Sequence, residues 1–275
     1  MKHLTMTDPR RDGHARGDTF PTNPTQSNDP PARAPRGPRP PRFVKARAWL
    51  RKGHDPLASL YLTIPVFLIY HLGILGVRSR NGVDFVSRAM FEVLDYSTGA
   101  YVALTLGLAA GLAAAVWILR RTSSFRTSEW LPMLGESLVL AVVVPLIAAW
   151  TTQQLFGWWI GLGSMSAYEK VVMAAGAGFH EELIFRGGLF GGLVFLLTRV
   201  FKASVTKAVL AAAVLSALVF SGIHYVGFFG DDFQLASFTF RALGGLLLAA
   251  VYWWRGFAVA VYTHMFYDLL VFFLK

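Results

Sequence analysis

The sequence of 275 residues contains no cysteine, which excludes disulfides, thiolate nucleophiles and cysteine-ligated metals. Charged residues are also scarce, at 15%, whereas hydrophobic residues reach 54% and the mean hydropathy is +0.46. This balance excludes an ordinary water-soluble domain and indicates a membrane protein. The net charge of +10 does not indicate a nucleic-acid partner, because much of the basic excess lies in the N-terminal tail and at the ends of apolar segments.

Residues 1–48 differ in composition from the rest of the chain. Between positions 30 and 42, prolines alternate with arginines, and apolar side chains are few. Proline removes helical hydrogen-bond donors, and so little apolar surface cannot offset the entropy lost on ordering. We expect a disordered, basic cytoplasmic tail, either simply solvated or in contact with anionic lipid.

Residues 49–275 hold the long apolar segments. A membrane-spanning helix needs about 20 apolar residues, and the fourth segment is too long for a single span. There we expect a re-entrant or amphipathic helix up to about Phe179, followed by a span. The prediction is an all-α, polytopic membrane bundle of about seven to eight transmembrane helices. The seven segments are Leu57–Val77, Gly99–Leu119, Trp130–Trp150, Tyr168–Thr198, Lys207–Val226, Ser237–Trp254 and Phe257–Leu274.

Basic residues at the ends of these segments predict their orientation, because lysine and arginine are enriched in cytoplasmic loops. With seven spans, the tail and most basic loop residues fall on one side. We therefore expect a cytoplasmic N-terminus and an external C-terminus, in a bacterial inner membrane. The basic loop residues on the tail's side are Arg120, Arg121, Arg126, Arg199, Lys202, Lys207 and Arg255.

Three of the last four apolar segments carry polar clusters. Each ionisable group inside a bilayer costs roughly 2.5–3.5 kcal/mol on insertion scales, so such groups mark function by default. Three such clusters predict one assembled site. The clusters are Glu181, Glu182 and Arg186; Phe220 and His224; and His264 and Asp268.

Spacing within the clusters predicts how their side chains meet. Residues at i and i+4 share a helical face, so Glu182 can neutralise Arg186 and Asp268 can hold one nitrogen of His264. Glu181 is then free to face a cavity. Carboxylates and two histidines are the groups that activate a water molecule. No side chain offers a convincing covalent nucleophile, so we expect water to attack the substrate.

The order Glu-Glu-x-x-x-Arg, Phe-x-x-x-His and His-x-x-x-Asn/Asp resembles the CPBP intramembrane proteases, which include the CAAX prenyl endopeptidases and the bacterial Abi proteins. The resemblance covers roughly Gly176–Leu270, within a CPBP-like core at about residues 168–275. It implies a glutamate-dependent peptidase inside the membrane, without a cofactor. Membrane proteins or lipidated proteins would be its partners, with a C-terminal membrane anchor, a sorting tail or a CAAX-like sequence as substrate.

The resemblance also implies roles for individual residues. Glu181 and His224 would activate the water, and His264 with residue 268 would support the oxyanion. Glu182 and Arg186 would hold the architecture or help to bind substrate, and Phe220 could wall the site.

Position 268 departs from the common pattern, because it holds aspartate where CAAX enzymes carry asparagine. An amide can donate a hydrogen bond to an oxyanion, whereas an ionised carboxylate only accepts. We predict that Asp268 acts indirectly, by orienting or charging His264.

Two alternative functions stay open. Zinc could be bound by His180, His224 and His264 with a glutamate, although the motif His-Glu-x-x-His is incomplete because position 184 is isoleucine. The chain could also be a non-catalytic scaffold or a bacteriocin-immunity protein.

Helix lengths give the depth of the site. Glu181 lies 18 residues before Arg199, and His224 lies 17 residues after Lys207. At 1.5 Å per residue, both lie about 26 Å from the cytoplasmic ends of their helices. The site is therefore predicted to lie toward the outer leaflet. His71, alone in the first segment, has no assigned role.

Overall fold

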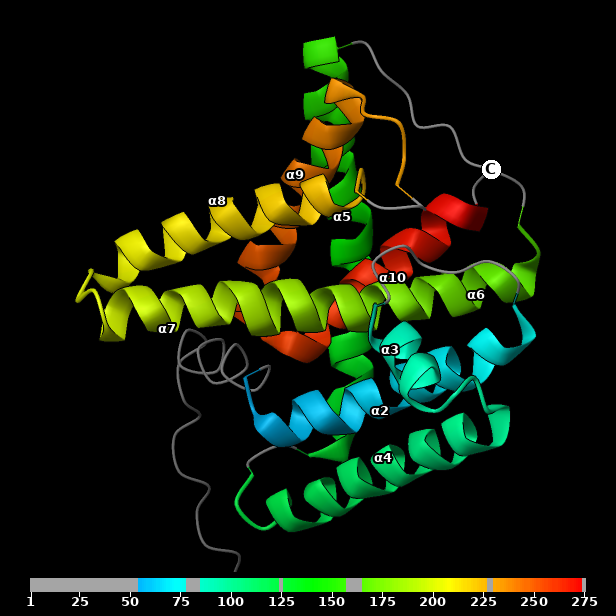
Figure 1. The fold of residues 1–275 in the computed structure, drawn as a ribbon. Coiled ribbons are helices and arrows are strands. Elements are labelled where there is room, and N and C mark those ends of the chain that lie inside the picture. The colour runs from blue at the N-terminus through cyan, green and yellow to red at the C-terminus, as the bar shows by residue number, and fades with distance from the viewer. Residues whose placement is uncertain (1–53, 78–84, 124–125, 157–164, 227–229, 274–275) are drawn as a thin grey trace, which may run out of the picture. The chain divides into compact units, whose positions relative to one another are not determined.

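A computed structural model describes residues 54–77, 85–123, 126–156, 165–226 and 230–273, which form helices with no β-strand among them (Figure 1). The predicted all-α class is therefore confirmed. The N-terminal tail and its predicted boundary at residue 48 lie outside the described residues, so that boundary stays a prediction.

All seven predicted segments are helical. Five helices in the described part of the chain are long and apolar enough to cross a membrane, and α10 is a shorter apolar helix. Asp55 caps the first helix by accepting a hydrogen bond from the Leu57 amide at 2.9 Å. These helices are α2 (Pro56–Gly73, continued by a 3₁₀ turn at Ile74–Gly76), α4 (Thr98–Leu119), α5 (Trp130–Phe156, preceded by a 3₁₀ turn at Thr127–Glu129), α8 (Val205–Ile223), α9 (Leu235–Arg255) and α10 (Phe257–Phe273).

The fourth segment is one continuous helical rod, and the expectation of a re-entrant or amphipathic part up to about Phe179 followed by a span stays a prediction. The rod starts with a capping box, in which Ser166 and Glu169 satisfy each other's amides. It widens into π-helical turns instead of breaking, and such turns are rare and frequently found at functional sites. Its parts are α6 (Ala167–Gly176), η3 (Ala177–Glu181), η4 (Leu183–Phe190) and α7 (Gly191–Arg199).

The short helix α3 (Phe85–Val93) was not among the predicted segments. It has only nine residues and carries a surface ion pair, in which Arg88 Nε lies 3.2 Å from Glu92 Oε1. A search for long apolar segments therefore passes over it.

Helix α10 packs against α2, α5, α6, α9 and η3, and its residues from Ala258 to Met265 are buried. At Gly178 in η3, an added Cβ would lie 2.8 Å from the carbonyl oxygen of Val261, so only glycine permits this close approach. Gly256, with φ of 85°, makes the tight connection between α9 and α10. The rod that carries the glutamates is thereby held against the helix that carries His264.

Polar contacts also join helices away from these clusters. Arg255, at the end of α9, forms a bidentate pair with Glu136 near the start of α5; the Nη2–Oε2 distance is 2.6 Å. His71 Nδ1 of α2 lies 2.7 Å from the Tyr101 hydroxyl of α4. His71 thus has a structural contact between helices.

Candidate active site

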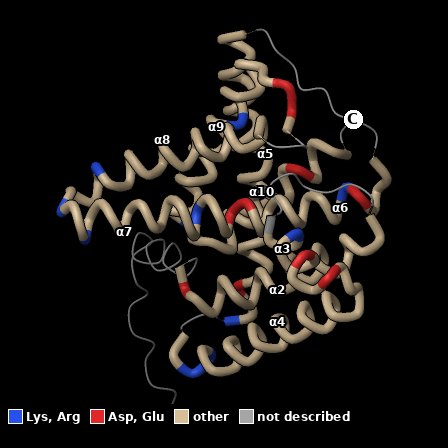
Figure 2. The backbone as a smooth tube through the Cα atoms, viewed as in Figure 1, with Lys and Arg blue, Asp and Glu red and all other residues tan. Residues whose placement is uncertain are grey.

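The π-helical part of the rod carries both glutamates in the middle of a long apolar element. Glu181, Glu182 and Arg186 are the charged residues of the rod between Lys170 and Arg199. Figure 2 shows acidic and basic segments in the middle of the rod, away from the basic turn between α7 and α8. Glu181, Glu182 and Arg186 are all buried, with exposures of 4%, 0% and 0%. Charges this deep must find partners, and the partners define the site.

Glu182 joins Arg186 to His264. Its Oε1 lies 2.9 Å from Arg186 Nη1 and 2.8 Å from His264 Nδ1. The predicted pair between Glu182 and Arg186 is therefore confirmed, whereas the contact to His264 was not foreseen. Arg186 also donates from Nη2 to the Gly245 carbonyl at 3.2 Å, and its guanidinium lies over the Phe220 ring.

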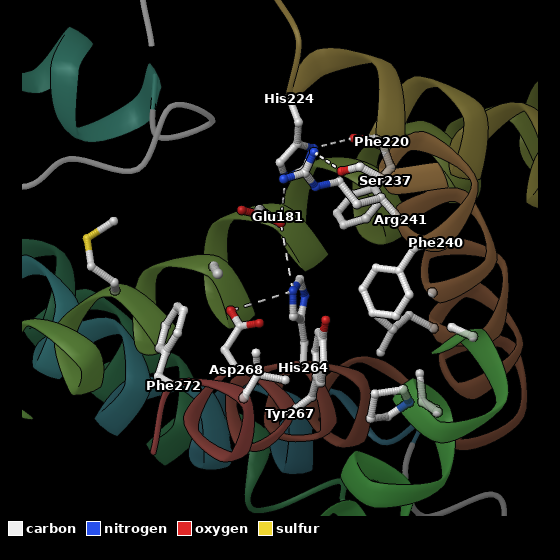
Figure 3. A pocket seen from close by; sticks show the side chains of 18 residues that line it. Glu181, Phe220, His224, Ser237, Phe240, Arg241, His264, Tyr267, Asp268 and Phe272 are labelled. Carbon is white, nitrogen blue, oxygen red and sulfur yellow. Dashed lines mark hydrogen bonds and ion pairs between the residues drawn. The ribbon is translucent and has the colours of Figure 1, made fainter. Parts of the chain in front are cut away.

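Glu181 lies between the two histidines (Figure 3). Its Oε2 is 4.0 Å from His224 Nε2 and 3.8 Å from His264 Nε2. These separations are too long for direct hydrogen bonds. A water that hydrogen-bonds two groups at tetrahedral angles spans roughly 4.4 Å, so each gap has nearly the width that one bridging water fills.

The backbone of α8 fixes the orientation of His224. Nδ1 lies 2.7 Å from the Phe220 carbonyl oxygen, which can only accept, so Nδ1 carries the hydrogen. In the neutral ring, Nε2 then presents its lone pair toward Glu181. The Phe220 and His224 rings also meet edge to face at 5.1 Å, so the aromatic side chain walls the site as predicted.

Asp268 lies near His264 but does not hold it. Its Oδ2 is 3.9 Å from His264 Nε2, beyond hydrogen-bond distance, whereas Glu182 Oε1 contacts the opposite nitrogen at 2.8 Å. The expectation that Asp268 fixes the tautomer is replaced by a contact from a different helix. The reason is that helical spacing shows which residues share a face but not which groups arrive from a neighbouring helix.

These groups surround a cavity of about 270 Å³. Apolar side chains from α5 and α10 form much of its wall, including Pro145 and Phe272. Glu181, Phe220, His224, His264 and Asp268 all line it, so the structure brings together five of the seven predicted site residues around one space. Glu182 and Arg186 lie behind them as supporting groups.

Sequence reasoning missed three polar lining residues: Ser237, Arg241 and Tyr267. Arg241 donates to the Tyr225 hydroxyl at 2.9 Å, to the Ser237 hydroxyl at 3.1 Å and to Asp231 at 2.5 Å. Its charge within an apolar helix was a usable signal, by the same argument that identified the glutamates. Ser237 and Tyr267 carried no such signal.

His180 belongs to a separate cluster. Its ring contacts Tyr70, His71 and Phe179 at centroid distances of 4.8, 5.1 and 5.2 Å, and it does not line the cavity. The described helices hold no group of three or more histidines and carboxylates placed for a metal ion. The alternative zinc set of His180, His224 and His264 is thus not assembled, because His180 packs among aromatic rings instead.

Comparison with known proteins gives one match. A family model described as type II CAAX prenyl endopeptidase Rce1-like matches residues 163–270. No curated protein and no solved structure matches the chain. The matched range contains all three motifs. Together with the five apolar helices, the match supports an integral membrane protein. The match to the Rce1-like type II CAAX prenyl endopeptidase model over residues 163–270 agrees with the resemblance to the CPBP/Abi family drawn from the motifs.

Proposed function

We propose that the protein is a glutamate-dependent intramembrane endopeptidase. One observation carries the proposal: Glu181 Oε2 lies within 4.0 Å of both imidazole Nε2 atoms, on the wall of a cavity set among apolar helices. A carboxylate between two fixed rings is suited to bind and deprotonate one water.

Glu181 and His224 activate that water. The neutral His224 ring offers the Nε2 lone pair, because its Nδ1 hydrogen is used by the Phe220 carbonyl. The water donates one hydrogen bond to His224 and one to Glu181, which directs an oxygen lone pair toward the substrate carbonyl. Glu181 then takes the proton as the oxygen–carbon bond forms, and later delivers it to the departing amide nitrogen.

His264 and Asp268 lie on the other side of Glu181, where the CPBP pattern implies the groups around the developing oxyanion. Glu182 holds His264 through Nδ1, and Arg186 balances the charge of Glu182. Arg186 and Glu182 therefore act by positioning His264. This arrangement follows the roles implied by the CPBP pattern and adds the link between Glu182 and His264.

The cavity and the family match support a proposal for the substrate class. A volume of about 270 Å³ accepts a short extended peptide rather than a folded domain. Its apolar walls suit a peptide that enters from the bilayer, such as a C-terminal membrane anchor, a sorting tail or a CAAX-like lipidated tail. The Rce1-like match supports the last of these.

We also propose that the site opens toward the outer leaflet of a bacterial inner membrane. His224 follows the end of α8 at Ile223, opposite the basic turn between α7 and α8. The chain has no cysteine of its own, so single cysteines can be labelled without background. Cysteines at Gly222 and Asp231 should react with an impermeant maleimide from outside intact cells, and one at Ser204 should not. Labelling of the first two only after the cells are opened would overturn this placement.

The proposed activity is tested with the purified full chain in liposomes. Quenched fluorescent peptides ending in a farnesylated CAAX sequence or in an apolar anchor serve as probes. We expect cleavage by the native chain, a loss of at least about 10²-fold in Glu181→Gln, and no effect of 1,10-phenanthroline. Unchanged cleavage in Glu181→Gln, or inhibition by the chelator, would refute the glutamate mechanism and favour the zinc alternative. Complete absence of cleavage would favour the scaffold or immunity function.

A further inference from the structure

Tyr267 lines the cavity beside His264 and has no role in the CPBP motif. The two rings stack at a centroid distance of 6.3 Å with an interplanar angle of 27°. Figure 3 shows Tyr267 running alongside His264 from α10, with its hydroxyl end directed into the cavity. The hydroxyl therefore faces the space in which a substrate carbonyl would lie.

The Tyr267 hydroxyl has no hydrogen-bond partner among the described residues, whereas each of the other polar groups that line the cavity has a hydrogen bond or an oppositely charged neighbour within 4.0 Å. Glu181 lies between the histidines, His224 holds the Phe220 carbonyl, and Arg241 holds Ser237. His264 is bound to Glu182, and Asp268 lies 3.9 Å from His264. A tyrosine hydroxyl in such a place usually finds a partner. The missing partner is then a water or the substrate.

The reaction needs a hydrogen-bond donor that the motif residues do not supply. An ionised Asp268 can only accept. Neutral His264 donates its one hydrogen to Glu182 and presents a lone pair at Nε2. If this ring is protonated, its Nε2 hydrogen points toward the carboxylate oxygens of Glu181 and Asp268, at 3.8 and 3.9 Å.

We propose that the Tyr267 hydroxyl donates a hydrogen bond to the oxyanion and takes the place of the amide that Asn would provide at position 268. This inference rests on the proposed peptidase function. Water attacks the carbonyl carbon, Glu181 takes its proton, and the carbonyl electron pair moves onto oxygen, where Tyr267 stabilises it without giving up its proton. The pair returns as the carbon–nitrogen bond breaks, and the nitrogen leaves with the proton from Glu181.

Tyr267→Phe removes only the hydroxyl and is the direct test. With the peptide that the native chain cleaves best, we expect kcat to fall about 10²–10³-fold, the range for one lost oxyanion donor, with KM within about twofold. Tyr262→Phe is the matched control on the same helix, because the Tyr262 hydroxyl donates to the Leu62 carbonyl at 2.8 Å and lies outside the cavity lining. It should lower thermal stability and leave kcat unchanged.

Rescue separates a donor from a merely structural ring. Asp268→Asn added to Tyr267→Phe supplies an amide donor next door and should raise kcat at least about tenfold above the single variant. A peptide phosphinate, which mimics the tetrahedral intermediate, should bind Tyr267→Phe more weakly by the same factor as the loss in kcat. No rescue, or unchanged phosphinate affinity, would overturn the role of Tyr267.

A second substitution covers the case in which Tyr267→Phe does not fold. Difluorotyrosine at position 267 keeps the ring and the hydroxyl but ionises near neutral pH, so kcat should fall as the pH rises through that range. An unchanged pH profile would refute the proposal. If Glu181→Gln abolishes cleavage while both Tyr267 substitutions keep native kcat, the peptidase function stands and the inference on Tyr267 fails by itself.

Discussion

Buried polar groups are arranged differently in helices α2 and α4 and in the family-matched region of residues 163–270. In α2 and α4, His71 and Tyr101 form a neutral hydrogen bond of 2.7 Å that joins two helices. In the region of residues 163–270, a chain of contacts runs from Arg186 to Glu182 at 2.9 Å, from Glu182 to His264 at 2.8 Å and from His264 to Glu181 at 3.8 Å. Only the second arrangement buries full charges.

This difference indicates whether the polar contacts of each region serve stability or chemistry. A neutral pair contributes about 1 kcal/mol and little else, whereas buried ion pairs seldom add net stability, because desolvation offsets their attraction. The two helices differ in burial, because 6% of the apolar window of α4 is buried, against 56% of that of α2. The charge network is therefore better explained by chemistry than by stability, and the first helices act as a packing support.

The strongest way to break this comparison is to replace one histidine in each region. His224→Gln should lower kcat by about 10²–10⁴-fold, because it removes the acceptor that orients the water. His71→Gln should lower thermal stability and leave kcat per folded molecule unchanged. Steady-state cleavage, normalised to folded protein by fluorescence-detected chromatography, measures both. Equal losses of kcat would show that the two regions are not functionally distinct.

Removal of a single charge tests the cost of burying the network. Glu182→Gln leaves Arg186 without its anion and should destabilise the protein by about 3–5 kcal/mol, with kcat reduced as His264 loses its support. Glu136→Gln removes a carboxylate that is 25% exposed, so water can partly replace it beside the buried Arg255, and its effect on stability should be smaller. Thermal unfolding in detergent ranks the two. A larger effect at Glu136 would contradict the buried network.

Asp268→Asn gives the smallest expected effect and sharpens the account of the oxyanion. Asp268 does not hold His264 within hydrogen-bond distance, and Asn is the residue of the common CAAX pattern. We expect kcat to stay within about tenfold of native, since an amide adds a donor where the carboxylate only accepted. Near-complete loss of cleavage would mean that the charge of Asp268 is required.

Much of this could be predicted from the sequence, because apolar length and helical spacing act locally. They identified the seven helical segments, the pair of Glu182 with Arg186, and the cluster of Glu181, His224 and His264. What they missed depends on neighbouring helices. The close approach occurs at Gly178, the π-helical turns continue past Phe179, and His264 is held by Glu182 instead of Asp268.

The sequence also did not identify some of the polar residues that line the cavity. Tyr267 and Ser237 are ordinary in an apolar helix, and only the assembled cavity distinguishes them from packing residues. In the same way, His180 looked like a metal ligand by its place in the sequence, yet its ring packs with Tyr70, His71 and Phe179.

The central claim is that Glu181 makes this protein a peptidase of the membrane. The most direct measurement compares the new protein termini, by mass spectrometry, in membranes of cells that carry the native chain or Glu181→Gln at equal abundance. We predict termini that appear only with the native chain and map near the outer side of membrane anchors or to lipidated tails. Identical sets of termini, with both proteins folded, would contradict the claim.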